Sequence, residues 1–239
     1  HAEYNNTLRD LFGIDLKPAD MFPHDLSGLS GFANSSNTLF IQSTLLERYI
    51  SAAEEIVTAA MPQWPLARET NPNTLFRTFL RRVYRRPPSD EEVSELVTRY
   101  QLAKAAGASH QEAIQPAVIF ALISPHFLYR IESAPANADD HLITDWELAS
   151  RLSYFLWAST PDDSLLNLAA AGTLSDPNIL REQIQRMLRD ERSSALGHEF
   201  ASQWLKFEHV GTRVRLDPID NPWCTDSLMT AMRDESAMF

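Results

Sequence analysis

Cysteine is almost absent from this chain, which holds a single one, Cys224, in 239 residues. One cysteine cannot build an internal disulfide framework or a cysteine-based zinc or iron–sulfur site. Covalent attachment of a c-type haem needs two cysteines ahead of a histidine. The sequence therefore excludes these sites from this part of the protein, and it leaves the redox compartment open.

Positive charge is also scarce. Lysine and arginine number 21 against 32 aspartate and glutamate residues, so the formal net charge is −11. Because a nucleic-acid-binding surface needs clustered cations that outweigh the local acids, we expect no nucleic-acid partner, and a basic protein or a neutral ligand fits better. No run of about 18 apolar residues is present, so the sequence predicts no transmembrane segment.

Strand patterns are missing, since β-branched residues do not alternate with polar ones over any convincing stretch. Helix start signals are frequent instead: a serine or threonine is followed three positions later by an acid, which is the spacing of a capping box. The pairs are Ser89 with Glu92, Ser109 with Glu112, Thr144 with Glu147, and Thr160 with Asp163. The predicted fold class is all-α, with several small helical units packed in series and joined by long irregular loops.

Three units are predicted along the chain: an N-terminal helical unit with a long loop over residues 1–66, a middle unit over 70–133, and a C-terminal unit over 141–239. A polar stretch separates the last two units. Pro116 falls inside a helical pattern, where proline costs about 3 kcal/mol, so we expect the helix to kink or restart there. The last helical pattern has no stop signal, and we expect the chain to be a truncated part of a longer protein.

The densest cluster of polar and aromatic groups is Ser124–Arg130. Its histidine, tyrosine and arginine offer one titratable group, one phenol and one fixed cation. We take His126, Tyr129 and Arg130, together with Arg151, as the candidate binding residues, and the pattern assigns no catalytic residue. The alternative is structural, with each polar group bound to neighbouring backbone or carboxylates.

Two charged regions each have two interpretations. The arginines of Arg77–Arg86 suggest a surface for phosphate or an acidic partner, but the acids of Asp90–Glu95 follow directly, so a solvated face of ion pairs is favoured. The acids and histidine of Asp15–Asp25 suggest a cation site, but their spacing matches no calcium-binding loop. We therefore predict no metal site and expect these groups to serve caps and turns.

Apolar and acidic residues complete the set of predictions. Trp157, Trp204 and Trp223 are expected to be core anchors, with an exposed sugar-stacking platform as the alternative. Leu148, Leu152 and Phe155 recur at intervals of four and three, which places them on one helix face. Four acids have two possible roles: they could form a pair of carboxylates that catalyses hydrolysis, or they could cap helices. Helix capping is the favoured role. These acids are Glu132, Glu147, Asp162 and Asp163.

Three phrases of the sequence together resemble a known series of domains: Glu3–Leu11, Ser124–Arg130 and Glu147–Trp157. They are similar to consecutive uncharacterised helical domains of large proteins of planctomycetes and some other bacteria. Pro161–Asp163 and Gln203–Leu205 also look like the last of these domains. Such domains often accompany c-type cytochrome domains, so the resemblance implies export and an electron-transfer setting for the full-length protein, and it supplies no catalytic residues.

Two hypotheses for function follow. The first is a non-catalytic helical scaffold or partner-docking module of an exported, periplasmic or extracellular, cytochrome c-associated protein. Its partner would be another protein or other domains of the same protein, with no cofactor in this segment and any haem c elsewhere in the full-length protein. The alternative is part of an extracellular polymer-degrading or oxidative enzyme, with a pocket around the four candidate binding residues.

Overall fold

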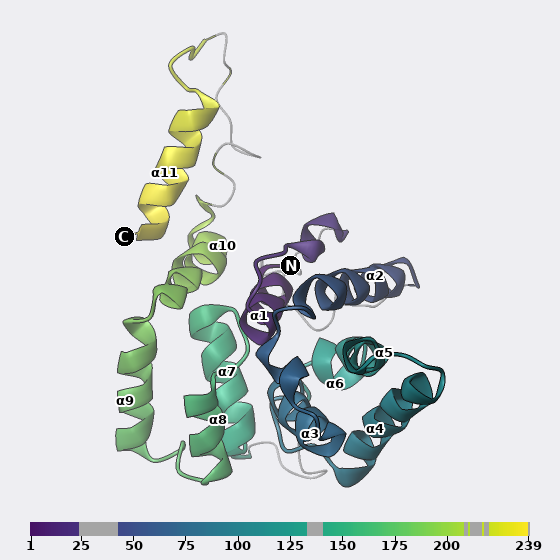
Figure 1. Ribbon diagram of the computed structural model, residues 1–239. Coiled ribbons are helices and arrows are strands. Elements are labelled where there is room, and N and C mark those ends of the chain that lie inside the picture. The colour runs from purple at the N-terminus through teal and green to yellow at the C-terminus, as the bar shows by residue number, and fades with distance from the viewer. Residues whose placement is uncertain (24–42, 133–140, 208–209, 211–216, 218–219, 239) are drawn as a thin grey trace.

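The computed structural model describes residues 1–23, 43–132, 141–207, 210, 217 and 220–238. The fold is 72% helical, and no strand occurs in the described part of the chain, which confirms the predicted all-α class. No described helix combines the length and the apolar composition needed to span a bilayer. The helices are arranged as two packed groups with a projecting C-terminal segment (Figure 1).

The larger group is built from the helices of the first two predicted units, and these helices share one hydrophobic core. The core runs from Leu8 and Phe12 on the first helix to Phe127 on the last, with Phe76 and Phe79 near its middle. The N-terminal and middle units therefore fold around a common interior. The helices are α1 (Ala2–Phe12), α2 (Ser43–Ala60), α3 (Pro72–Val83), α4 (Asp90–Ala105), α5 (His110–Leu122) and α6 (Pro125–Leu128), with 3-10 turns η1 (Pro18–Met21) and η2 (Pro65–Arg68).

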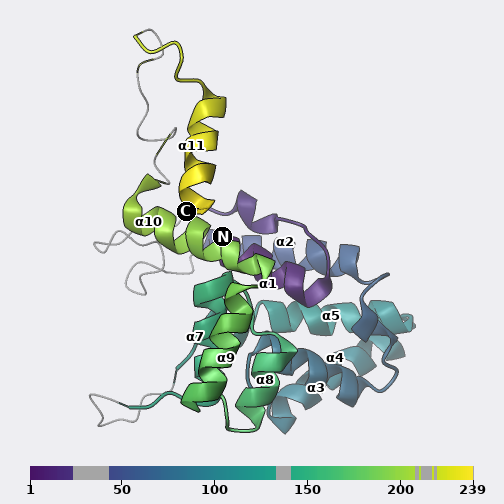
Figure 2. The same cartoon turned by 90° about the vertical axis from the view of Figure 1, so that its left-hand side faces the viewer.

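The smaller group has its own core around Trp157, which packs with Leu165, Leu174 and Met187. Its helices are α7 (Asp145–Trp157), α8 (Asp163–Ala170) and α9 (Pro177–Leu188), followed by the 3-10 turn η3 (Glu191–Ser193), the π-helix η4 (Leu196–Ala201) and α10 (Ser202–Leu205). The last helix, α11 (Asp226–Met238), projects from this group beside α10 (Figure 2). It packs against η4 at Gly197, where an added Cβ would lie 2.5 Å from the carbonyl oxygen of Ala237.

Helix capping follows the sequence at three of the four predicted positions. Ser89, Ser109 and Thr144 each form a complete capping box with the glutamate three residues on, as predicted. The fourth prediction is wrong, because Asp162 caps α8 by accepting from the Leu165 amide, while the Thr160 hydroxyl donates to the carbonyl of Arg82. A carboxylate one residue before the helix displaced the hydroxyl from the capping position.

Pro116 also departs from its prediction in part. Helix α5 runs without a restart from His110 to Leu122 with Pro116 inside it. Buried residues on both sides of the proline, Ala113 and Ala117 among them, pack into the larger core. Tertiary packing therefore outweighs the local cost of the missing backbone donor.

The aromatic predictions divide between the core and the surface. Trp157 is fully buried, as predicted, but Trp204 and Trp223 are 64% and 61% exposed, so their prediction as core anchors is wrong. Phe155 is likewise 52% exposed, although Leu148 and Leu152 do pack against the smaller core. Phe155 instead packs edge-to-face against Phe200, with ring centroids 5.3 Å apart. Phe200 in turn stacks on Trp204, so these aromatic rings pack together outside the core.

Candidate functional site

The structure brings the four candidate residues, His126, Tyr129, Arg130 and Arg151, to one cavity of about 440 Å³ between α6 and α7. We call it the arginine pocket. Its wall also contains Tyr84, Arg85, Arg86, Trp146, Glu132 and Glu147.

Local sequence positions the candidate residues at one edge of the arginine pocket. Ser124 caps α6 by accepting from the His126 amide, and Pro125 pre-sets the first helical turn. The helix ends after one turn because Tyr129 has an extended backbone. The chain then leaves the larger core with Tyr129 42% exposed and the Arg130 side chain reaching back to α1.

Arg85 holds this short helix in place. Its guanidinium donates to four backbone carbonyls: Val83 at 3.1 Å, His126 at 2.9 Å, Phe127 at 3.0 Å and Tyr129 at 2.9 Å. The residue is only 4% exposed and has a φ of 57°, a left-handed conformation that is uncommon outside glycine. A buried cation in strained backbone thus fixes the carbonyls of three residues beside the arginine pocket.

The cluster Arg77–Arg86 is therefore only partly the solvated face that was predicted. Arg77 pairs with Asp90 at 2.6 Å and Arg86 with Glu92 at 2.6 Å, as expected for ion pairs between neighbouring helices. Arg85 departs from this pattern because it is buried. Arg81 reaches the smaller group, where it donates to Asn167 at 2.8 Å.

Ion pairs line the arginine pocket. Arg130 binds Glu3 at 2.6 Å, and Arg151 binds both carboxylate oxygens of Glu132. The Arg151 guanidinium holds the pKa of Glu132 below its usual range, and Arg86 does the same to the pKa of Glu92. The site hypothesis and its structural alternative therefore describe the same side chains, which line one cavity, and the two arginines among them are each held by a carboxylate.

Tyr154 lies between the two groups of helices, and the sequence did not single it out. Its hydroxyl is 3.0 Å from that of Thr7 on α1, and the Arg130 guanidinium lies 4.6 Å from its ring centroid. The Arg85 guanidinium lies 5.7 Å from the same ring. The one available signal was its place in the phrase Glu147–Trp157, on which the family resemblance rests.

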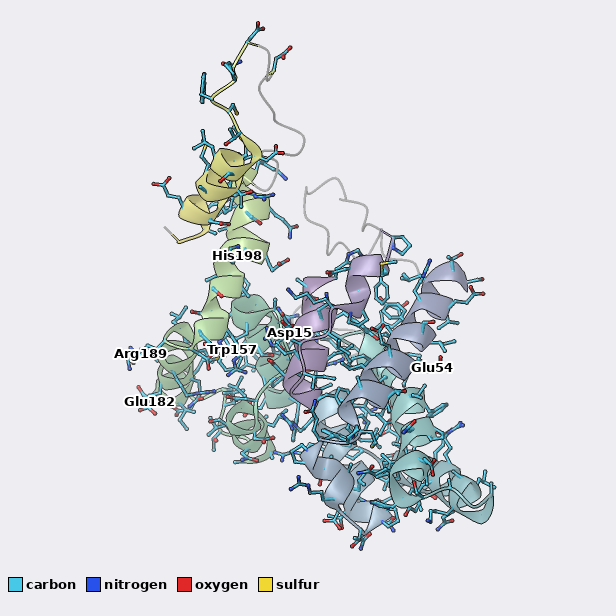
Figure 3. All side chains as sticks on the ribbon, turned by 45° about the horizontal axis from the view of Figure 1, so that its top comes forward. Asp15, Glu54, Trp157, Glu182, Arg189 and His198 are labelled. Carbon is cyan, nitrogen blue, oxygen red and sulfur yellow. The ribbon has the colours of Figure 1, made fainter. Side chains whose placement is uncertain are left out.

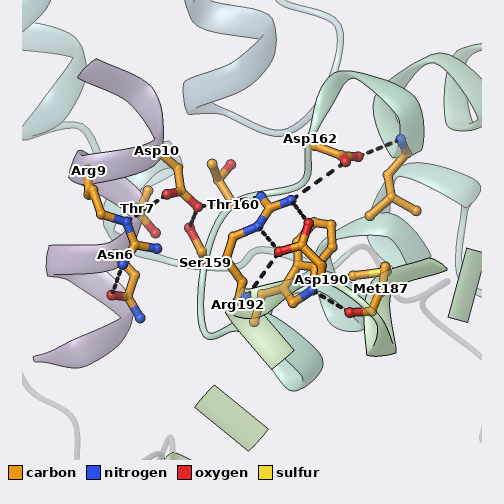
Figure 4. A network of polar contacts seen from close by, with 12 residues as sticks. Asn6, Thr7, Arg9, Asp10, Ser159, Thr160, Asp162, Met187, Asp190 and Arg192 are labelled. Atoms are coloured by element: carbon orange, nitrogen blue, oxygen red, sulfur yellow. Dashed lines mark hydrogen bonds and ion pairs between the residues drawn. The ribbon is translucent and has the colours of Figure 1, made fainter. Parts of the chain in front are cut away.

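A second and larger cavity, of about 1,260 Å³, separates α1 from the smaller group of helices. We call it the inter-unit cleft. The Asp10 carboxylate accepts from the Ser159 hydroxyl at 2.7 Å and lies 3.7 Å from the Arg192 guanidinium (Figure 4). Asp10 belongs to the first predicted unit and the other two residues to the third, so this network joins the units.

Arg192 is the centre of the polar network in the inter-unit cleft. It donates to both oxygens of Asp190, at 2.8 and 2.7 Å, and its Nη2 atom is 4.0 Å from Asp162. Its guanidinium lies flat against the smaller core, 3.5 Å from the ring centroid of Trp157. Sequence reasoning missed Arg192 and Asp190, because their role depends on a contact with α1, more than 170 positions earlier.

The π-helix η4 contributes His198 and Glu199 to the rim of the inter-unit cleft. His198 lies on the segment that connects the smaller group of helices around Trp157 to α10 (Figure 3). π-helices are rare in proteins, and those that occur are often found at functional sites. The π-helix η4 therefore makes the inter-unit cleft a second candidate site.

The four acids weighed as a hydrolytic pair are engaged in other contacts. Glu147 closes the capping box of α7, and Asp162 caps α8 while it also binds Arg186 at 2.7 Å. Glu132 holds Arg151, and Asp163 lies 3.8 Å from Arg82. Among the described residues, no three histidine, cysteine, aspartate or glutamate side chains are grouped as a metal site. Asp20 accepts from Asn5 at 2.9 Å, whereas His24 and Asp25 lie outside the described residues.

Acid should weaken the Asp190–Arg192 pair. Hydrogen bonds from Arg192 lower the pKa of Asp190 from 3.8 to about 2. A depressed carboxylate pKa contributes stability that is complete above pH 4 and is lost as the pH falls toward 2. We expect Asp190→Asn to melt below the parent at pH 6 and the difference to shrink toward pH 2. Thermal melts across this range test it, with Glu191→Gln as the control for one lost charge, and a difference independent of pH would contradict it.

The geometry defines an all-helical protein whose units are joined by polar contacts across two cavities. Three family models match consecutive stretches of it, and each is described as a protein of unknown function: PSD3 (DUF1587) over residues 1–62, PSD5 (DUF1595) over 73–132 and PSD4 (DUF1592) over 143–239. Three consecutive domains from families of unknown function are thus found along the chain. No curated protein and no solved structure matches it.

Proposed function

We propose that this chain is a non-catalytic helical scaffold, or partner-docking module, of an exported protein associated with c-type cytochrome domains. The observation that carries the scaffold role is the set of polar contacts between units distant in sequence. Glu3 binds Arg130, Thr7 meets Tyr154, and Asp10 accepts from Ser159. All three contacts start from α1 and fix it against α7 and against the segments that follow α6 and α7.

These contacts favour a structural role for the polar side chains of both cavities. A general acid or base must exchange a proton with a substrate, and a nucleophile is activated by an adjacent base, a lowered pKa or a metal ion. Arg130, Arg151 and Arg192 are fixed cations bound to carboxylates. Exposed ion pairs of this kind contribute about 0–1 kcal/mol each, so their main effect is on orientation. The rigid frame they produce suits a module that presents other domains or a protein partner.

The proposed export and cytochrome association rest on the family resemblance and are tested on the natural full-length protein. We expect the parent protein in the periplasmic or extracellular fraction, with covalently bound haem that survives denaturing electrophoresis and stains there. The haem must lie outside this segment, because covalent attachment needs two cysteines and the segment has only Cys224. A haem-free parent protein in the cytosol would remove this part of the proposal and leave the scaffold role standing.

The alternative function is part of an extracellular polymer-degrading or oxidative enzyme. The observation that favours it is the arginine pocket, where the structure brings His126, Tyr129, Arg130 and Arg151 together. Release of new reducing ends or oxidised products from a polymer, abolished by His126→Ala, would favour the enzyme over the scaffold.

A further inference from the structure

We propose that the arginine pocket binds an uncharged oligosaccharide segment. This binding activity goes beyond the scaffold role. It rests on the balance of charge in the pocket, on polar groups held rigid by one another, and on aromatic rings in the wall.

The charges of the pocket cancel. Among the described residues, four arginines line it, and four glutamates line it or pair with those arginines. The pairs Arg86–Glu92, Arg130–Glu3 and Arg151–Glu132 are each within 2.6 Å. An anion would have to bind next to the glutamates that already pair with these arginines, and the chain as a whole carries −11. A neutral polar ligand can bind without breaking any pair. The charged residues of the lining are Arg85, Arg86, Arg130, Arg151, Glu132 and Glu147, and the glutamates that pair with two of these arginines from outside the lining are Glu3 and Glu92.

The paired groups are well suited to hydroxyl groups. Arg151 uses Nε and Nη2 for Glu132, so its Nη1 lies outside that pair, and Arg130 uses Nη1 for Glu3. A guanidinium has five donors and a carboxylate about four acceptor positions, so each pair keeps capacity on both sides. A sugar hydroxyl donates and accepts at once and can bridge such a pair. Because each partner holds the other, little side-chain entropy is lost on binding.

Aromatic rings supply the remaining surface. The Tyr129 ring is 42% exposed, and Trp146 is half-buried in the same wall. Arg81 lies 5.6 Å from the Trp146 ring centroid and holds that ring in position. The apolar C–H face of a pyranose packs on such rings while its hydroxyls reach the polar groups. The volume of about 440 Å³ falls within the range of small-molecule sites, roughly 300–1,000 Å³.

Titration calorimetry with defined probes tests the proposal on this chain. The neutral probes are cellohexaose, xylohexaose, mannohexaose and chitohexaose, and hexagalacturonate is the acidic comparison. We expect at least one neutral probe to bind with a Kd of about 1 mM or tighter. Tyr129→Ala and Arg151→Gln, both at exposed side chains, should each weaken it by about tenfold or more. Arg77→Gln is the matched control for Arg151→Gln, because Arg77 is also an exposed arginine paired with a carboxylate but lies outside the pocket.

Three outcomes would overturn the proposal. One is that no neutral probe binds at about 5 mM. Another is binding that survives both pocket variants while their helical circular dichroism matches the parent. The third is tighter binding of hexagalacturonate than of every neutral probe, with a steep loss on adding salt, which would make the pocket an anion site.

Discussion

Trp157→Ala is expected to lower the free energy of unfolding by about 3–5 kcal/mol. Trp157 is fully buried, and its indole N–H donates to the Met187 carbonyl at 3.0 Å. The guanidinium of Arg192 also packs on its ring. Alanine would leave a cavity in the smaller core, remove one of the donors to the Met187 carbonyl and leave an arginine without its stacking surface. Urea unfolding followed by far-ultraviolet circular dichroism measures the change.

Two variants separate the causes of this loss. Trp157→Phe keeps a ring but removes the donor to Met187, so we expect an intermediate cost of about 1–3 kcal/mol. Trp204→Ala is the matched control, since the Trp204 side chain is 64% exposed and its loss should change stability by less than about 1 kcal/mol. Equal destabilisation by Trp157→Ala and Trp204→Ala would show that the smaller core is not centred on Trp157.

Arg85→Ala is the second substitution with a large expected effect, about 3–5 kcal/mol of lost stability. Four carbonyls lose their common donor, and three of them belong to the short helix and its exit at the edge of the arginine pocket. The same variant should therefore displace His126 and Tyr129 as well as destabilise the fold. Denaturant unfolding measures the first effect, and proteolysis near residue 129 under native conditions measures the second.

Arg85→Gly tests the contribution of the backbone. Glycine adopts a φ of 57° without the Cβ crowding that alanine would suffer, so Arg85→Gly should be more stable than Arg85→Ala by up to about 1 kcal/mol. Arg85→Lys keeps the charge but offers three donors from one atom, and we expect it to recover only part of the loss. If Arg85→Lys were as stable as the parent, charge alone and not the guanidinium fork would hold the short helix.

The all-α fold was predictable because its signals are local. Capping boxes at Ser89, Ser109 and Thr144 involve residues three positions apart, and each formed as the sequence predicted. Where a competing group was near, local reasoning failed, as at Thr160, where Asp162 took the capping role. Burial was harder to predict than helix formation. Trp204 has the same side chain as Trp157, and only tertiary packing leaves it exposed.

The sequence pointed to four residues of the candidate site, but not to the residues that hold them in place. The cluster Ser124–Arg130 was found from its composition, but its clamp, Arg85, was expected on a solvated face because the acids of Asp90–Glu95 directly follow the arginine cluster. No local sequence pattern links Asp10 with Arg192, because 182 positions separate the two residues. Contacts of that length depend on how whole units dock, which no local pattern encodes.

The polar contacts of α1 have a consequence for the order in which the protein forms during synthesis. Helices α3, α4 and α5 contact one another at short sequence separation, so this part can fold while the ribosome is still adding residues. Helix α1 is made earlier, yet Arg130, Tyr154 and Ser159 emerge 127 to 149 positions after their partners on it. Helix α1, although it is translated before these partners, is therefore among the last elements of this chain to be fully docked, and until then its polar face stays open to water and to chaperones.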